Sequence, residues 1–164
     1  MSRHLELLIH AAFLKLAAVL FLLFPAWIAG AQEATRKANF NLHDNVAIDG
    51  YDPVSYFDDH KAVEGKKALS LTHEGVVYYF SSPTHRDKFK SDPAKYEPAY
   101  GGWCAFAMGD SGEKVEVDPE TFKIIDGRLY LFYNKFFNNT LTSWNKNEPA
   151  LKSKADVNWQ RYVK

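Results

Sequence analysis

An Asp-Gly pair between two apolar runs constrains the fold of this chain more than any other feature. Asp126 and Gly127 separate residues 122–125 from residues 128–133. Such a pair is the strongest short signal for a β-hairpin, because the tight turn needs positive φ angles that these residue types adopt easily. Within residues 128–133, apolar side chains occupy both alternating faces. We therefore expect both faces of this hairpin to be covered and the hairpin to be central to a sheet.

Further strands are expected on the N-terminal side of this hairpin. Residues 68–72 and 76–80 are predicted to form a second hairpin, because a β-branched and aromatic run is bounded by turn-forming residues. Residues 46–57 predict two short strands around a turn. Residues 114–117 predict another strand, followed by a turn at an Asp-Pro pair.

Helices are expected between and after these strands. Two of them begin where a side chain that caps helices precedes a proline, at Ser82-Pro83 and Asp92-Pro93. Two later segments show helical spacing of apolar residues. The predicted helices are residues 83–90, 93–96, 136–144 and 148–162. The expected fold class is α+β: a single domain in which short helices pack on a small antiparallel sheet.

The first residues have the three parts of a secretory signal peptide. A basic residue at Arg3 is followed by an apolar run at residues 16–24 and by the small triplet Ala-Gly-Ala at residues 29–31. We expect cleavage after this triplet, which makes residues 1–31 the signal peptide and the mature protein periplasmic or secreted. An uncleaved membrane anchor is the alternative, but the run is shorter than the roughly 20 residues that a spanning helix needs.

The mature chain is expected to be one domain behind a tail. Residues 32–44 are predicted to be a flexible N-terminal tail and residues 45–164 the domain. The whole chain has 20 Lys and Arg against 20 Asp and Glu, without a long basic run. This balance gives no electrostatic basis for binding nucleic acid or an anionic membrane surface. We expect neither partner after signal cleavage.

The only cysteine lies in a glycine- and aromatic-rich stretch, residues 99–108. A single cysteine forms no disulfide within the chain, so Cys104 is either a buried core side chain, a partner of another molecule or a ligand. Cys104 and Met108 are the softest donors in this stretch, and soft donors select soft metals. Gly101 and Gly102 allow another segment or a ligand to approach closely.

Six short motifs follow one another along the chain. They are residues 50–57, residues 79–82, Phe89 with Asp92, Pro93 and Tyr96, residues 100–105, residues 126–131, and residues 155–159. Together they resemble the YHS domain family, in its longer branch that carries a signal peptide. The resemblance spans about residues 45–159. It implies an α+β domain and a binding module, since short members of the family are similar to zinc- and copper-handling domains.

The metal-binding cysteines of that family are mostly replaced in this chain. By the resemblance, their positions fall on Ser55, Ser81 and His85, and a serine hydroxyl is a poor substitute for a thiolate. His85 is expected in the first turn of a helix, where the helix dipole favours the neutral ring that a metal needs. With Cys104 and Met108 it forms the candidate site for a copper or zinc ion. Further donors that would complete it are His73, Tyr79 and Asp52.

Three hypotheses for function remain open at this point. The first is a binding module for copper or another transition metal through His85, Cys104 and Met108. The second is a domain that binds a non-metal small ligand or a protein in an aromatic cleft. The third is a thiol enzyme with Cys104 as nucleophile and His85 as base. No thiol-hydrolase signature surrounds the cysteine, so we expect no catalytic residues.

Overall fold

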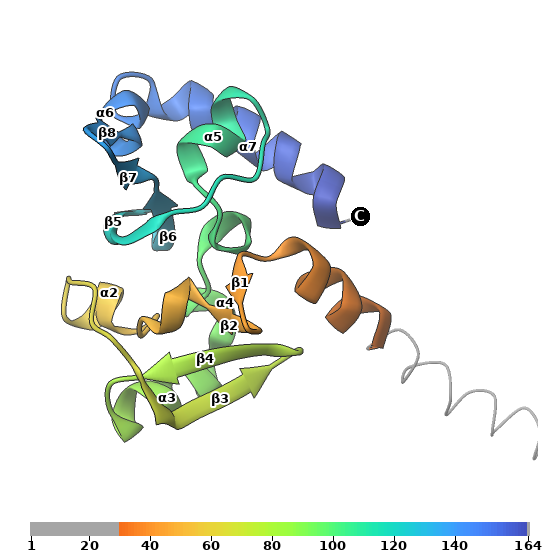
Figure 1. Ribbon diagram of the computed structural model, residues 1–164, viewed down its shortest axis with the longest axis vertical. Coiled ribbons are helices and arrows are strands. Elements are labelled where there is room, and N and C mark those ends of the chain that lie inside the picture. The colour runs from red at the N-terminus through yellow and green to blue at the C-terminus, as the bar shows by residue number, and fades with distance from the viewer. Residues whose placement is uncertain (1–29, 164) are drawn as a thin grey trace, which may run out of the picture.

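The chain forms a four-stranded sheet and two hairpins, and residues 99–104 connect the sheet to the part that holds the hairpins (Figure 1). The computed structural model describes residues 30–163. Helices and strands alternate within this part, which confirms the α+β class. The expected signal segment lies outside the described residues, apart from Gly30 and Ala31 at its end. Between residues 30 and 163, we find no helix with the length and apolar character required to span a bilayer.

A four-stranded sheet with the order β1-β2-β4-β3 forms the first half. β1 and β2 are antiparallel, β2 runs parallel to β4 through the single pair Val46 and Val77, and β3 and β4 are antiparallel. The β3–β4 pairing confirms the hairpin expected from residues 68–72 and 76–80. The strands are β1 (Leu42–His43), β2 (Val46–Ala47), β3 (Lys66–His73) and β4 (Val76–Phe80).

Short helices pack against one side of this sheet. The Ser82 hydroxyl accepts a hydrogen bond from the backbone N–H of His85, and Asp92 caps the next helix in the same way. Both predicted helix starts are therefore confirmed. Phe89 of the first of these helices packs on Tyr78 of β4, with ring centroids 4.6 Å apart. The helices are α2 (Ser55–Asp58), α3 (Pro83–Ser91) and α4 (Pro93–Tyr96), with the 3₁₀ turns η1 (Ile48–Gly50) and η2 (Ala99–Gly102).

The two strands expected in residues 46–57 are not both present. Only β2 forms, and the chain then enters η1 and α2. Ile48 and Asp49 have φ angles of 54° and 51°, which lie outside the strand region. Asp52 then accepts a hydrogen bond from the backbone N–H of Val54. This side-chain turn directs the chain into α2 rather than into a second strand.

The second half holds two hairpins and three helices. In the first hairpin, Asp126 and Gly127 form the expected turn, with φ angles of 50° and 73°. This hairpin is a separate two-stranded sheet, so the expectation that it is central to a larger sheet is wrong. The elements are α5 (Ala105–Asp110), β5 (Asp118–Ile125), β6 (Arg128–Phe132), β7 (Asn134–Lys135), β8 (Asn138–Asn139), α6 (Thr140–Trp144) and α7 (Glu148–Val163).

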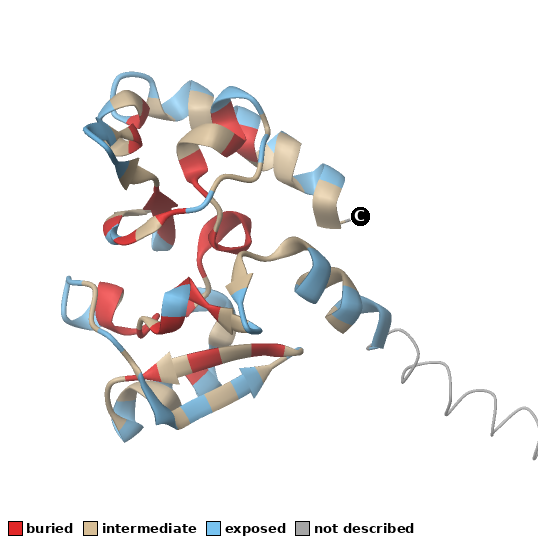
Figure 2. Cartoon of the chain, in the orientation of Figure 1, coloured by how far each residue is buried: buried red, intermediate tan, exposed pale blue. Residues whose placement is uncertain are grey.

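β6 nevertheless has both faces covered, as its sequence predicts. Leu129 and Leu131 belong to the hydrophobic cluster of the first half, whereas Tyr130 and Phe132 belong to the cluster around α5, α6 and α7. All four side chains are completely buried. The cover comes from two hydrophobic clusters rather than from neighbouring strands. Figure 2 shows buried residues along β6 and throughout η2, where the two halves meet.

Two other element boundaries differ from expectation. Residues 114–117 are not in a strand, and β5 begins at Asp118, where a turn was predicted. A shift in the β5–β6 register between Asp118 and Phe122 accommodates the proline. The helix expected over residues 136–144 begins only at Thr140, because the residues before it form the β7–β8 hairpin. The predicted helix over residues 148–162 is confirmed as α7.

The flexible tail expected in residues 32–44 is also corrected. Residues 30–39 are helical, and β1 follows as part of the sheet. Arg36 in this helix forms an ion pair with Glu97. The indole N–H of Trp103 donates to the backbone carbonyl at the end of the helix, over 2.6 Å. These partners lie more than 60 positions away in the sequence, so local composition gave no sign of them.

Candidate functional site

Asp52 is the centre of a buried polar cluster that follows η1. Its side chain is fully buried. One carboxylate oxygen, Oδ1, accepts the N–H of Val54 at 2.9 Å. The other, Oδ2, accepts the N–H of Ser81 at 2.8 Å, the Ser81 hydroxyl at 2.6 Å and the Nδ1–H of His85 at 2.7 Å. Four hydrogen bonds hold the carboxylate in one position, and they tie the loop after η1 to the end of β4 and the start of α3.

This cluster orients the ring of His85. The side chain is 13% exposed and lies in the first turn of α3, as the sequence predicts. A carboxylate only accepts hydrogen bonds, so Asp52 holds the ring proton on Nδ1 and leaves Nε2 with its lone pair in the neutral imidazole. Among residues 30–163 we find no hydrogen-bond partner for Nε2. Carboxylates orient metal-binding histidines in the same way.

Buried tyrosines fix the elements that carry this cluster. Tyr56 of α2 donates to the carbonyl of Pro119 at 3.0 Å, and Tyr78 of β4 donates to the carboxylate of Glu97 at 2.7 Å. Burial is the main cause that raises the pKa of both phenols well above its ordinary value. Both tyrosines therefore remain neutral hydrogen-bond donors at physiological pH.

Cys104 has partners of its own, away from this cluster. Its thiol is fully buried, and its sulfur lies 3.4 Å from the Thr140 hydroxyl and 3.4 Å from the backbone N–H of Tyr133. His85 is not among the hydrogen-bond partners of the sulfur. The arrangement agrees with the simplest of the alternatives that the sequence left open, a buried core cysteine.

The other expected donors are also dispersed. Met108 is fully buried in the cluster around α5, α6 and α7, whereas Cys104 belongs to the cluster of the first half. His73 packs against Phe89, with ring centroids 6.1 Å apart. In the described part of the chain, no three His, Cys, Asp or Glu residues are grouped so that they could hold a metal ion. Of the expected set, only Asp52 and His85 are joined by a side-chain hydrogen bond among the described residues.

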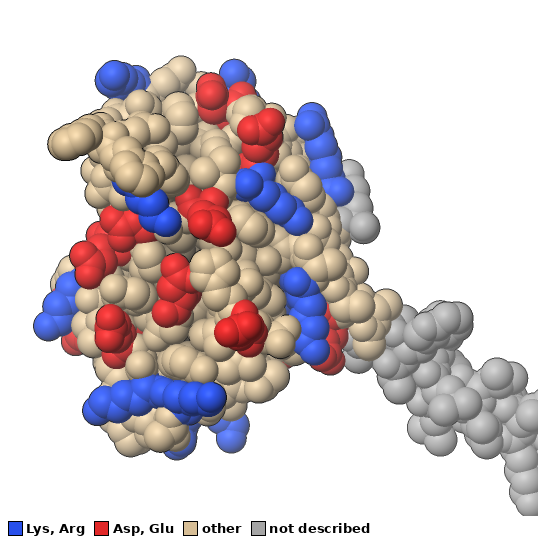
Figure 3. Space-filling model, in the orientation of Figure 1, with Lys and Arg blue, Asp and Glu red and all other residues tan. Residues whose placement is uncertain are grey.

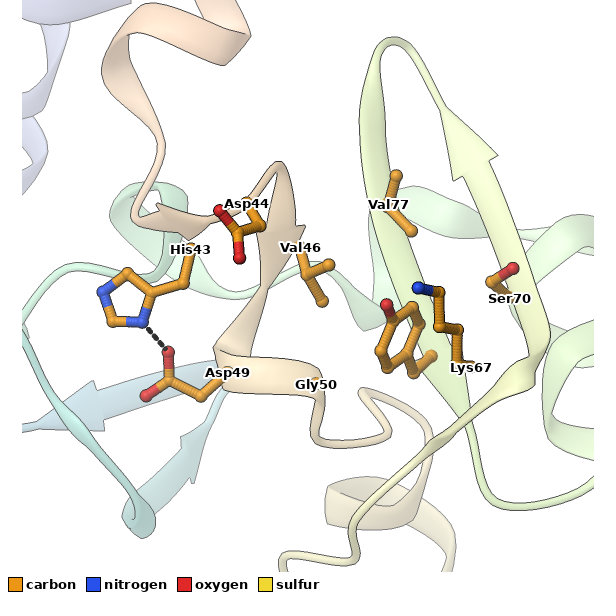
Figure 4. A pocket seen from close by; sticks show the side chains of 9 residues that line it. His43, Asp44, Val46, Asp49, Gly50, Lys67, Ser70 and Val77 are labelled. Atoms are coloured by element: carbon orange, nitrogen blue, oxygen red, sulfur yellow. Dashed lines mark ion pairs between the residues drawn. The ribbon is translucent and has the colours of Figure 1, made fainter.

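A groove of about 540 Å³ lies elsewhere, between η1 and the β3–β4 hairpin (Figure 4). The β1–β2 turn and η1 form one side, and β3 forms the other. On the first side His43 and Asp49 form a pair, with 2.6 Å between Nδ1 and Oδ1. The groove is lined by His43, Asp44, Val46, Asp49, Gly50, Lys67, Ser70, Val77 and Tyr79.

The groove exists because β2 leaves the sheet early. β2 and β4 are paired only at Val46 and Val77, after which η1 diverges. Gly50 has a φ angle of 84° and lies against the ring of Tyr79, where an added Cβ atom would be 3.2 Å from the ring. The residues before it, Ile48 and Asp49, also have positive φ angles. Strained backbone of this kind is concentrated at functional sites in proteins.

Sequence patterns did not identify this groove. His43 and Asp44 belong to the expected tail, Asp49 and Gly50 belong to an expected turn, and Gly50 also begins the first motif of the resemblance. The available signal was the density of turn-forming residues in 43–50, which is unusual beside a strand. That signal does not indicate which strands the segment faces.

The charges on the surface are mixed rather than segregated. Figure 3 shows Lys and Arg residues interspersed with Asp and Glu residues on the visible face. Most of the ion pairs among the described residues connect exposed or half-buried side chains, as between Lys88 and Asp58 at 2.6 Å. The face in view thus offers no continuous basic track of the kind that nucleic acids follow.

Comparison of the chain with protein-family models, with curated proteins and with solved structures gave no match. The resemblance to the YHS domain family therefore stays a prediction from the motifs.

Proposed function

We propose that this chain is a binding module for a small organic ligand, and that the groove between η1 and the β3–β4 hairpin is its binding site. The observation that carries the proposal is the chemistry of the lining. Val46, Val77 and Tyr79 supply apolar surface, while Asp44 and Lys67 supply opposite charges. Among the described residues neither charge has an ion-pair partner. Pockets of this size with a few oriented polar groups are typical small-molecule sites.

The lining indicates the chemical class of the ligand. Asp44 comes from the β1–β2 turn and Lys67 from β3, so their charges approach the groove from different sides. A molecule with an ammonium and a carboxylate around an apolar body satisfies both charges and covers the ring of Tyr79. We therefore infer a zwitterion of the size of an amino acid.

This function agrees with the YHS-type interpretation of the motifs and with the signal segment expected at residues 1–31. Within that proposal, the mature protein is a periplasmic or secreted module that holds its ligand without transforming it. The buried thiol of Cys104 supports a binding role over a thiol enzyme, because the attacking sulfur of such an enzyme must reach its substrate.

Titration of ¹⁵N-labelled protein with three probes tests the groove. L-phenylalanine carries both charges, phenylacetate lacks the ammonium and phenethylamine lacks the carboxylate. We expect chemical-shift changes at the groove amides, with L-phenylalanine binding at least tenfold more tightly than either probe that lacks one charge. Lys67→Ala should reduce binding of L-phenylalanine to the level of phenethylamine, and Asp44→Asn to the level of phenylacetate.

Lys66→Ala provides the matched control, because Lys66 precedes Lys67 on β3 and does not line the groove. It should bind all three probes as the unchanged chain does. If none of the probes shifts the groove amides at 10 mM, or if Lys66→Ala and Lys67→Ala weaken binding equally, the proposed site is wrong.

A transition-metal ion at His85 is the second candidate function. The observation that favours it is the 2.7 Å contact between Nδ1 and Asp52, which leaves Nε2 as the free nitrogen of an oriented ring. Copper and zinc both accept imidazole nitrogen. Because the side chains of Cys104 and Met108 are buried in the core, His85 is the one protein ligand in this second candidate. We therefore expect the metal affinity to be weak.

Metal content and uptake test this second candidate. Protein prepared without chelators is analysed for bound metal and titrated with Cu(II), Cu(I) and Zn(II) over a concentration range wide enough to detect weak binding. His85→Ala should abolish uptake, whereas Cys104→Ser should leave it unchanged. His60→Ala is the control, because His60 is an exposed histidine in the loop after α2. Equal uptake by the His85→Ala and His60→Ala variants would assign the metal to surface histidines and reject the candidate.

A further inference from the structure

The tip of the β7–β8 hairpin carries the two most exposed large apolar side chains of the described residues. Phe136 is 90% exposed and Phe137 is 111% exposed. They form a two-residue turn between the paired residues Lys135 and Asn138. Their φ angles are 51° and 64°. In Figure 1 this hairpin lies at the end of the molecule away from the β3–β4 hairpin.

Phenylalanine is poorly suited to this turn. Two-residue hairpin turns require positive φ angles, which Asn-Gly adopts readily and bulky side chains adopt at a cost. Two asparagines follow directly, at positions 138 and 139, yet they occupy β8 and not the turn. The chain thus accepts local strain and places two rings in water. Departures from local sequence rules without structural gain are expected at functional positions.

We propose that this tip inserts into the interfacial region of a phospholipid bilayer. Two phenylalanine side chains bury at most about 150–250 Å² each. A stable protein interface needs about 800 Å² from each partner. The residues beside the tip are polar and cannot extend the apolar area: they are Asn134, Lys135, Asn138 and Asn139. An apolar wedge of this size is sufficient for a lipid interface, because moving each ring out of water contributes a favourable free energy of transfer.

The surroundings of the tip fit the same partner. Lys135 is exposed beside the rings, so its ammonium can stay among the headgroups while its carbon chain follows the rings inward. The chain has no net formal charge, and its charges are mixed on the face that Figure 3 shows. The contact therefore depends on apolar insertion and not on anionic lipid. The proposal replaces the expectation that the mature chain has no membrane partner, and it is independent of the ligand groove.

A fluorescent label beside the tip tests the proposal in the full chain. Cys104 is fully buried, so a cysteine introduced at an exposed position is the thiol that reacts in the folded protein. Asn138→Cys is labelled with an environment-sensitive fluorophore and mixed with phosphatidylcholine vesicles. We expect the emission to rise at least twofold and to shift to the blue, with little change when salt is raised. This readout reports the tip itself, whatever the N-terminal residues do.

The decisive variant combines Phe136→Asn with Phe137→Gly in the labelled chain. This Asn-Gly turn should fold at least as well as the unchanged chain, as thermal unfolding will show, and should lose the fluorescence response. Val157→Cys provides the control label, because Val157 is also exposed but lies on α7. It should not respond. A response that survives in the Asn-Gly variant, an equal response at Val157, or no response of the unchanged tip at millimolar lipid overturns the proposal.

Discussion

Replacing Asp52 by asparagine should lower the free energy of unfolding by about 3 kcal/mol. The carboxylate accepts hydrogen bonds on both oxygens, from Val54 on one side and from Ser81 and His85 on the other. An amide has one oxygen and one NH₂ group, so in either orientation a donor faces a donor. Buried donors that lose their acceptor cost more than an average hydrogen bond contributes. Urea unfolding followed by circular dichroism measures the change.

Asp59→Asn is the matched control for this prediction. Asp59 is exposed, follows α2 and makes no ion pair among the described residues. It should change the free energy of unfolding by less than about 0.5 kcal/mol. Equal effects at both positions would show that the four hydrogen bonds of Asp52 contribute nothing specific. Ser81→Ala in the Asp52→Asn background should cost less than it does alone, because the two share one network.

Replacing Gly109 by alanine should destabilise the protein by about 2 kcal/mol, against the helical preference of alanine. Gly109 lies in α5 where that helix crosses α7. An added Cβ atom would lie 2.5 Å from the carbonyl oxygen and 3.0 Å from the carbonyl carbon of Leu151. Both are backbone atoms, so α7 must move as a whole. The higher helix propensity of alanine stabilises the protein by at most about 1 kcal/mol, and we expect the steric clash with Leu151 to cost more than that.

Asp110→Ala separates the two effects. Asp110 is the next residue of α5 and is exposed, so the change gains helical propensity without touching α7. Its melting temperature should equal or exceed that of the unchanged chain, while Gly109→Ala melts several degrees lower. If Gly109→Ala instead raises the melting temperature, the close approach of α5 and α7 is wrong.

The sequence predicts those features that depend only on residues close to one another in the chain, such as turns and helix caps. The turn at Asp126-Gly127, the cap at Ser82 and the cap at Asp92 each involve side chains and backbone within four residues, and all three formed. Asp52 shows the limit. Its partners Ser81 and His85 lie 29 and 33 positions away, so local patterns indicate Asp52 only as a further metal donor and do not predict this hydrogen-bonded cluster.

The remaining differences have the same origin. The polar composition of residues 32–39 does not indicate that Glu97 and Trp103 contact this segment. These two residues hold the helix of residues 30–39 in place through long-range contacts. Cys104 is a soft donor because its side-chain atom is sulfur, which the sequence alone shows. Its contacts with Thr140 and Tyr133 depend on the fold, because both residues lie far from Cys104 in the sequence. For β6, alternation correctly predicts that both faces are covered, but the further expectation that the hairpin is central to a larger sheet is wrong, because alternation does not indicate which strands pair.

The two-sided packing of β6 also determines how the molecule comes apart. Leu129 and Leu131 complete one hydrophobic cluster, and Tyr130 and Phe132 complete the other. Neither cluster survives if β6 is withdrawn, so the two halves melt together rather than one after the other. A chain cut anywhere before β6 leaves its N-terminal piece with an open cluster. The domain is therefore a single cooperative unit, despite its three separate sheets.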